Sequence, residues 1–186
     1  MFGASSSEGA LAPEGEFDPS IEPTPGEFLD GHDVLAERAH VDFHEVTREL
    51  FEDRGVYDVT FGYNLAELNR DTRHASAGYR YAESVDDPGV LLAEFTPTTP
   101  FCPQSDTLTR GSFRAWNGLA DRHDYDLVRV HVSQMHQRSA AINDALADAE
   151  AAFRETGDLP DEPSGADGGP RAPPSRDEGF WTDAPF

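Results

Sequence analysis

The chain has 186 residues, enough for one domain with a hydrophobic core, with or without tails. Its 36 acidic residues outnumber 14 basic residues, all of them arginine, so the formal charge at pH 7 is −22. A surface of this sign repels phosphate backbones and anionic membranes, which excludes nucleic acid and the membrane surface as expected partners.

Two explanations of the acidity compete. The first is an acidic interaction protein that docks basic partners. The second is adaptation to a salt-rich cytoplasm, where the Debye length shrinks to a few ångströms and the repulsion between acidic side chains is screened. The absence of lysine and the spread of acids along the chain favour the second explanation. The composition therefore resembles that of a halophilic archaeal protein.

Charge and composition predict one domain between two tails. Residues 1–31 and 156–186 are rich in proline and glycine and carry charges of −7 and −5, which leaves −10 on residues 32–155. Both ends are too polar to bury much surface, so we expect them to be disordered. The folded domain is then expected over residues 32–155.

The predicted elements alternate between helices and strands. Apolar residues recur at helical spacing in three segments, and two strands flank the turn Asp86–Gly89. A third strand alternates apolar and polar residues, and the segment 56–72 is ambiguous, with a short helical turn near Leu65 and Leu68. This order predicts a small α/β (α+β) domain with a short mixed sheet of about three strands packed by three helices. The expected elements are a helix over 33–54, strands over 79–83 and 90–96, a helix from Pro103 to about Leu119, a strand over 126–132 and a helix over 139–154.

The single cysteine, Cys102, excludes an intramolecular disulfide and lies where a strand turns into a helix. Proline favours the first turn of a helix, so Pro103 predicts that Cys102 lies at or near the helix N-cap. Free N–H groups and the positive helix end would stabilise a thiolate there, and Thr98, Thr99 and Ser105 place hydroxyls nearby. The alternative is a buried cysteine that serves as a small hydrophobic residue.

Three separated segments resemble one family. Residues 79–103, which include the run Glu94-Phe95-Thr96-Pro97-Thr98 and the pair Cys102-Pro103, resemble the central hairpin and cysteine loop of the PaaD/SufT-like metal–sulfur cluster biosynthesis family. Residues 135–150 resemble the His-bearing loop and following helix of its eukaryotic branch, the cytosolic iron–sulfur assembly targeting subunits. Residues 64–69 resemble the Leu-Glu-Glu-Leu-Asn turn of that branch, and the match spans roughly residues 45–153.

The resemblance implies a helper protein that assists maturation or delivery of iron–sulfur clusters, with Cys102 as the functional thiol. It implies a transient iron or iron–sulfur cluster as cargo, and the assembly machinery and recipient apoproteins as partners. One cysteine cannot hold a cluster that normally takes four thiolates. A homodimer, an external thiol or further ligands would be needed, and the candidate ligands besides Cys102 are His136, Asp58 and Glu67.

One departure from the family pattern leaves other functions open. The family has Asp-Pro-Glu where this chain has Asp58-Val59-Thr60, so the glutamate is missing. One alternative is therefore a degenerate member that serves only as a protein-interaction adaptor. Another is a thiol-dependent enzyme with Cys102 as nucleophile and His136 or Asp106 as the orienting group. A third signal, His40 and His44 four residues apart, suits a divalent ion, but a polar helix face explains the pair more simply.

No segment predicts a membrane or secretory protein. No apolar run approaches the roughly 18 residues that a membrane span needs. The N-terminus lacks the basic start and apolar stretch of a secretory signal. We therefore expect a soluble, cytoplasmic protein.

Overall fold

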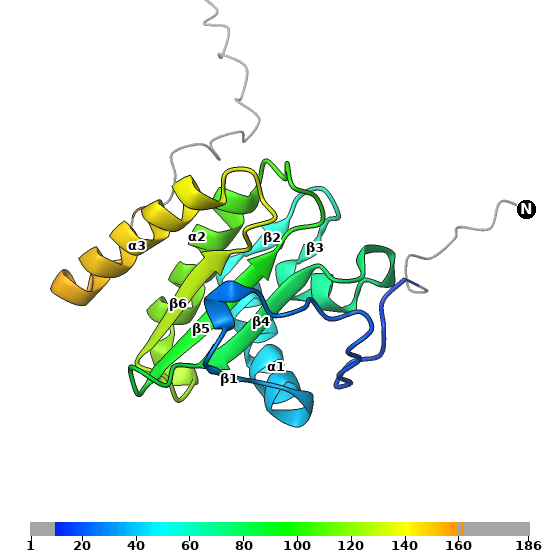
Figure 1. Cartoon of the computed structure of the whole chain (residues 1–186), viewed down its shortest axis with the longest axis horizontal. Helices are drawn as coiled ribbons and strands as arrows, with labels where there is room; N and C mark the ends of the chain where they lie inside the picture. The colour runs from blue at the N-terminus through cyan, green and yellow to red at the C-terminus, as the bar shows by residue number, and fades with distance from the viewer. Residues whose placement is uncertain (1–9, 160, 162–186) are drawn as a thin grey trace, which may run out of the picture.

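The computed structural model describes residues 10–159 and residue 161 (Figure 1). Its centre is a four-stranded sheet in the order β1-β4-β5-β6, in which β4 is antiparallel to β1 and β5, and β5 is parallel to β6. A two-stranded antiparallel hairpin, β2–β3, stands apart from this sheet. The strands are β1 (Asp33–Val34), β2 (Tyr57–Asp58), β3 (Tyr63–Asn64), β4 (Gly78–Glu83), β5 (Val90–Thr96) and β6 (Leu127–Val132).

Three α-helices pack against the sheet in the described part of the chain. They are α1 (Glu37–Arg54), α2 (Ser105–Gly118) and α3 (Ser139–Thr156). The helices α1 and α2 contact each other, whereas α3 runs beside β6 at the edge of the sheet (Figure 1). Short 3₁₀ helices complete the described chain: η2 (Glu27–Leu29), η3 (Leu65–Arg70), η4 (Thr72–His74) and η5 (Ala120–Arg122).

The predicted fold class is confirmed: the protein is a single mixed α/β domain. The ambiguous segment 56–72 contains the hairpin β2–β3 and then η3, which accounts for the helical turn expected near Leu65. The sheet has one strand more than expected, because residues 33–34 pair with β4 and the first helix begins only at Glu37. That helix ends as predicted at Gly55, whose φ of +67° closes the last turn in the left-handed conformation.

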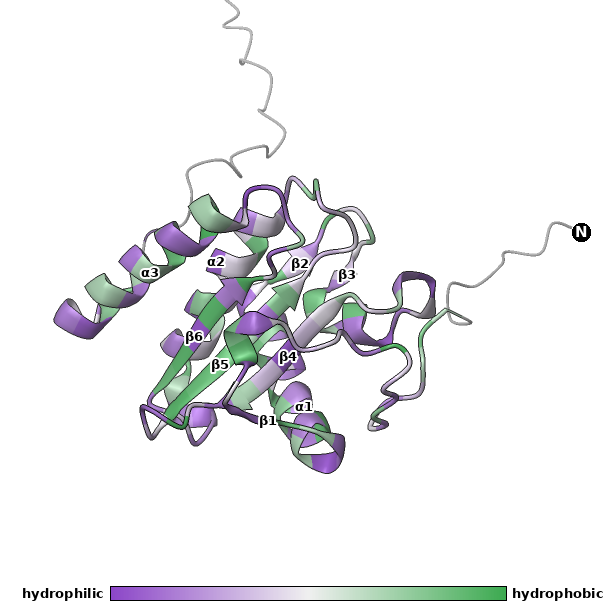
Figure 2. Cartoon of the chain, in the orientation of Figure 1, coloured by the Kyte–Doolittle hydropathy of each residue, from purple (hydrophilic) through white to green (hydrophobic). Residues whose placement is uncertain are grey.

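The main core lies between the sheet and the helices α1 and α2. The apolar stripe of α1 buries Phe43, Leu50 and Phe51 against Tyr81 and Trp116. Hydrophobic residues dominate β5 and β6, while polar and apolar positions alternate along α1 and α3 (Figure 2). Each of these helices therefore has an apolar face and a polar face, as the helical spacing of apolar residues in the sequence predicted.

The N-terminal segment differs from the expected disordered tail. Residues 10–32, called the strap from here on, begin beside η3 and α1 and then cross the sheet, at Glu27–Leu29, on the face opposite α1 and α2 (Figure 1). Leu29 of the strap is 1% exposed and packs in a second, smaller apolar cluster with Ala82 and Leu92. Backbone hydrogen bonds also fix the strap, for example from Ser76 N to Ile21 O at 2.7 Å. Disorder was therefore a wrong expectation for residues 10–31.

The remaining tail expectations fall largely outside the described residues. Residues 1–9, 160 and 162–186 are not described. At the other end, α3 continues to Thr156, and Gly157 ends it with a φ of +75°. The third helix is therefore slightly longer than the expected 139–154.

A close backbone approach pins the strap to the sheet at Gly26. The Gly26 N–H donates to Oε1 of Glu94 at 2.7 Å, and Glu94 is 4% exposed. A Cβ atom at position 26 would lie 2.6 Å from that same oxygen. Burial raises the pKa of Glu94, and the Gly26 N–H partly opposes this rise. A side chain at position 26 would therefore force either the buried carboxyl group of Glu94 or the strap to move.

Gly26→Ala is expected to destabilise the protein by about 1–3 kcal/mol, because the added methyl group forces the strap away from Glu94. Urea unfolding followed by circular dichroism measures the change. Gly111→Ala in α2 is the matched control, since its added Cβ makes only ordinary contacts at 3.7 Å and alanine favours a helix. Equal free energies of unfolding for wild type and Gly26→Ala would contradict the close approach.

Candidate interaction site around Cys102

Cys102 lies in the loop that joins β5 to α2. Its thiol is free, and the residue is partly exposed. The helix α2 begins at Ser105 with Gln104 as its N-cap, so Cys102 lies two residues before the cap rather than at it. The loop is tightly wound, with Cys102 N donating to Thr99 O at 3.4 Å and Ser105 N donating to Cys102 O at 3.4 Å. The thiol thus sits on a compact turn just ahead of a helix.

The loop between β6 and α3, residues 133–138, holds the cysteine loop in place. His136 is 4% exposed, and its Nε2 lies 3.0 Å from the carbonyl oxygen of Cys102. Its Nδ1 accepts a hydrogen bond from Arg138 N at 3.1 Å, so the proton must be on Nε2, which donates to Cys102 O. A backbone hydrogen bond from Gln137 N to Pro100 O at 2.9 Å adds a second link.

The β2–β3 turn joins the same end of the molecule through Gln104. The Gln104 Nε2 donates to Thr60 Oγ1 at 2.6 Å, and its Oε1 accepts from Val59 N at 3.2 Å. Asp58 shapes this turn, because its Oδ1 accepts the backbone N–H groups of Thr60 and Phe61 at 2.8 and 3.2 Å. Three loops distant in sequence therefore meet around the cysteine.

Each of these three loops exposes one large apolar side chain. Val59 is 80% exposed, Phe101 is 66% exposed and Met135 is 42% exposed. Single exposed apolar residues are ordinary on a protein surface, but here one comes from each loop that borders the thiol. We call Val59, Phe101, Cys102 and Met135 the cysteine face.

The other residues predicted around Cys102 have mixed surroundings. Thr99 and Pro103 are exposed, and Thr98 is partly buried. Ser105 is fully buried, and its hydroxyl has no hydrogen-bond partner among the described residues. Its side chain therefore belongs to the interior beneath α2 rather than to the exposed loop.

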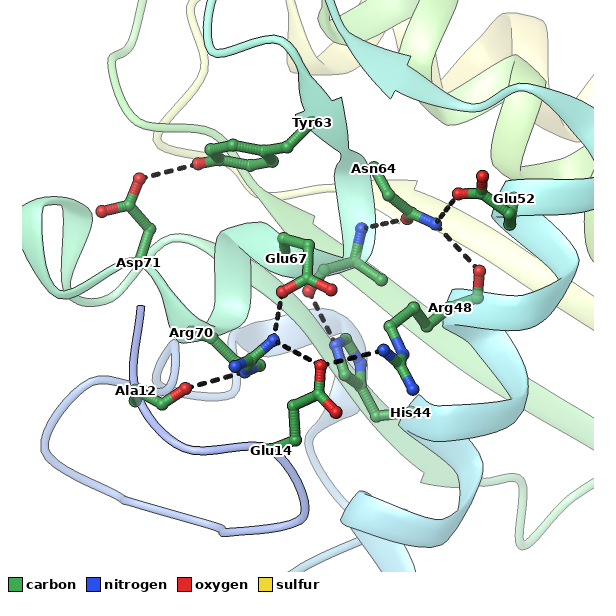
Figure 3. Close-up of polar contacts among 11 residues, drawn as sticks. Ala12, Glu14, His44, Arg48, Glu52, Tyr63, Asn64, Glu67, Arg70 and Asp71 are labelled. Carbon is green, nitrogen blue, oxygen red and sulfur yellow. Dashed lines mark hydrogen bonds and ion pairs between the residues drawn. The ribbon is translucent and has the colours of Figure 1, made fainter. Parts of the chain in front are cut away.

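The predicted metal ligands other than Cys102 have protein partners in this structure. His136 uses both ring nitrogens for backbone contacts, and Asp58 uses its carboxylate for its own turn. Glu67 lies on η3 and forms an ion pair with Arg70 (Figure 3). Among the described residues there is no group of three or more His, Cys, Asp or Glu side chains that would hold a metal ion. Cys102 is left as a single candidate ligand, which does not fit a resident cluster.

The groups expected to assist a nucleophilic Cys102 have other partners. Asp106 forms an ion pair with Arg110, with Arg110 Nε 2.7 Å from its Oδ1. His136 faces the carbonyl of Cys102 and has no ring nitrogen free to accept a proton from the thiol. This arrangement weakens the case for a thiol-dependent enzyme, which needs a base within reach of its nucleophile.

A buried polar cluster beneath the strap was missed by the sequence reasoning. His40 is 1% exposed rather than part of a polar helix face, and its Nε2 lies 3.4 Å from the buried carboxylate of Glu22. Next to it, His44 Nε2 contacts Ala66 O at 2.9 Å and its Nδ1 contacts the Tyr81 hydroxyl at 2.7 Å. The sequence contains no signal for this cluster, because Glu22 comes from a segment whose composition indicated disorder.

Charged side chains close the outer rim of this cluster (Figure 3). Glu14 of the strap reaches Arg48 of α1 and Arg70 of η3, with one carboxylate oxygen 3.0 and 3.4 Å from their Nη1 atoms. Arg70 also donates through Nε to Ala12 O at 2.9 Å. These contacts tie the start of the strap to two elements of the main domain.

A family comparison now places the chain. Residues 10–160 match the model of a family described as Domain of unknown function (DUF7998). The chain belongs to this family. No curated protein and no solved structure matches it. The matched region includes the strap, so it is larger at the N-terminus than the expected domain over 32–155. No helix in the described ranges is long and apolar enough to cross a membrane.

His44 predicts a pH-dependent loss of stability. Burial, with a contribution from nearby His40, lowers the pKa of His44 from 6.5 to about 4. A histidine with a lowered pKa contributes stability that is fully present above pH 6.5 and is lost as the pH falls towards 4. Between pH 7 and 4.5 the free energy of unfolding of wild type should fall about 2 kcal/mol more than that of His44→Gln.

Urea unfolding at several pH values measures this difference, because glutamine keeps a donor and an acceptor but does not titrate. His74→Gln, in the surface turn η4, is the matched control and should follow wild type. Parallel pH profiles for wild type and His44→Gln would exclude His44 as the source of the acid sensitivity.

Proposed function

We propose that the protein is an iron–sulfur cluster assembly or targeting factor that acts by protein–protein contact through the cysteine face. The observation that carries the proposal is the contact between two of the segments that resemble the metal–sulfur cluster biosynthesis family. The cysteine loop of residues 79–103 and the His-bearing segment 135–150 meet through the hydrogen bond from His136 to Cys102. Two segments that match the same family and meet around one thiol support a common function for that part of the molecule.

The cysteine face suits contact with another protein. Its thiol is partly exposed, and exposed apolar side chains from three loops border it. Apolar and aromatic side chains supply most of the binding energy at protein interfaces. A compact loop held by His136 also loses little conformational freedom when a partner binds. These features favour docking over turnover of a small substrate.

The cluster is treated as cargo in this proposal. Iron–sulfur clusters normally take four thiolates, and this chain offers one. Cys102 would therefore contribute one ligand during transfer, while the donor, the recipient or a second copy of the chain supplies the others. Shared ligation of this kind explains how cluster transfer would depend on Cys102 although the chain has only one cysteine.

Cys102→Ser should lower the activities of cluster-dependent enzymes several-fold in cells that rely on this protein, without affecting enzymes that lack clusters. Iron and sulfide retained after anaerobic mixing with a loaded donor should fall in the same variant. Phe101→Ser, which leaves the thiol in place, should weaken capture of the recipient protein. Unchanged enzyme activities in cells with Cys102→Ser would contradict the proposal.

The two variants also distinguish the adaptor alternative. An adaptor needs the apolar side chains but not the thiol, so only Phe101→Ser would then lower the enzyme activities. Thr99→Ala is the matched control, since Thr99 is exposed on the same loop and its side chain makes no hydrogen bond among the described contacts. All three proteins should unfold at similar urea concentrations.

We also propose that the acidic surface suits a salt-rich medium. The acidic side chains that give the net charge of −22 repel one another most strongly at low ionic strength, and salt screens this repulsion. The unfolding temperature of the full chain should rise by about 5–10 °C between low salt and molar KCl, which corresponds to about 2–3 kcal/mol. An equal rise in an uncharged osmolyte of matched osmolality would show that charge screening is not the cause.

A further inference from the structure

A row of polar side chains crosses the sheet beneath the strap. In the strand register Arg80 of β4 pairs with Glu94 of β5, and Glu94 pairs with His131 of β6. Most neighbouring residues on this face are apolar and belong to the second cluster, for example Leu92, while Arg129 of β6 lies on the same face and pairs with Glu150. Arg80 is 8% exposed and Glu94 is 4% exposed. Charged groups are seldom buried on a sheet face without a specific role.

The strap satisfies Arg80 and Glu94 through backbone groups. Arg80 Nη1 donates to Pro23 O at 3.1 Å, and Glu94 Oε1 accepts from Gly26 N at 2.7 Å. Any extended peptide can offer a carbonyl group like that of Pro23, and any such peptide with a glycine in the right place can offer an N–H group like that of Gly26. The two charged side chains therefore recognise backbone groups of the strap, and Arg80 also lies over the ring of Phe17, with its Cζ 5.3 Å from the ring centroid.

The third member of the row recognises an aromatic ring. Phe28 of the strap stacks on His131 with ring centroids 3.8 Å apart and an angle of 10° between the planes. An open cleft of about 320 Å³ lies beside this stack and is bordered by Glu27, Glu94 and Asn143. The spacing of the recognised groups is thus Pro-x-x-Gly-x-Phe, from residue 23 to residue 28.

The strap leaves part of this row unsatisfied. Arg80 Nε is buried and has no hydrogen-bond partner among the described residues, although the two other guanidinium nitrogens donate to Pro23 O and Leu35 O. The ring nitrogens of the buried His40, on α1 next to the strap, also make no hydrogen bond among the described residues, although Nε2 lies 3.4 Å from a carboxylate oxygen of Glu22. A buried donor without a partner weakens the closed arrangement. The strap therefore covers the row without meeting all of its hydrogen-bonding capacity.

We propose that the strap is a removable cover and that Arg80, Glu94 and His131 form a binding site for an extended peptide segment of a partner protein. The partner segment has the same chemistry as the strap: a carbonyl for Arg80, a glycine N–H for Glu94 and an aromatic ring for His131. A further acceptor in the partner would satisfy Arg80 Nε. The site does not involve the thiol, so the inference does not depend on the function proposed for Cys102.

A contact chain connects this site to the cysteine loop. Glu27 of the strap accepts a hydrogen bond from Gln134 Nε2 at 2.8 Å. Gln134 lies in the same loop as His136, which donates to the carbonyl of Cys102. Replacement of the strap by a partner segment removes the contact with Gln134. Peptide binding would thereby loosen the loop that supports the cysteine face.

A labelled synthetic peptide of residues 20–31 tests the site by fluorescence anisotropy against the full chain. The Phe28→Ala protein has a weakened strap but an intact row, so it should bind the peptide at least about tenfold more tightly than wild type, because its site is open more of the time. A peptide with Gly26→Ala should not bind, since its methyl group would collide with Glu94.

Glu27→Ala provides a second protein variant, because it removes the exposed contact with Gln134 and leaves the apolar cluster intact. It keeps the test valid if Phe28→Ala does not fold. Equal binding of the native and Gly26→Ala peptides, or no peptide binding to either loosened variant, would overturn the proposal. A dimer of Phe28→Ala in size-exclusion chromatography that the peptide does not dissociate would indicate exchange of straps between copies instead, and would overturn it too.

Discussion

The parallel pairing of β5 and β6 is the constraint on which the rest of this structure depends. Parallel neighbours cannot be joined by a tight turn and need a crossover, which here is the helix α2. Both strands therefore end at the same edge of the sheet, and the loops that follow them must leave from there side by side. One of these loops carries Cys102, and the other carries His136. Their contact is thus a consequence of strand direction, and His136 fixes its details.

The two faces of the sheet are covered in different ways. On one face α1 and α2 bury an apolar core that includes Tyr79 and Trp116. On the other face the strap takes the place of a helix. It has little regular structure and is held by hydrogen bonds between its backbone and buried polar side chains. A strap of this kind is held by a few directional contacts, whereas a packed helix is held by a broad apolar area. Local opening of a domain begins where buried apolar contacts are few.

The sequence was sufficient for the parts of the fold that depend on local periodicity. The three helices, the strands β4, β5 and β6 and the turn at Asp86–Gly89 all follow from apolar spacing and turn residues. The strand β1 and the strap could not be predicted in this way, because they are stabilised by partners distant in sequence. The Gly26 contact with Glu94 joins residues 68 positions apart. Proline and glycine in the strap indicated disorder, although here they allow a close approach to the sheet.

The candidate site was predicted with similar limits. Resemblance to a family singled out Cys102 and His136, and the structure brings both to one end of the molecule. For His136 to serve as a metal ligand, one of its two nitrogens would have to give up its contact with Cys102 O or Arg138 N. Tautomers and hydrogen-bond partners depend on three-dimensional geometry, so residue identity alone cannot reveal them. Asp58 illustrates the same limit, because its carboxylate closes a turn.

The bonding of His136 also explains how one thiol can serve as an interaction site. The imidazole donates to the backbone carbonyl of Cys102, so it positions the loop that carries the sulfur. The sulfur stays partly exposed on a fixed turn, and chemistry beyond a single ligand must come from another molecule. Under the proposed function, a protein built in this way would depend on complexes for its activity. The strap, which contacts the same supporting loop through Glu27 and Gln134, lies where a second partner would influence that dependence.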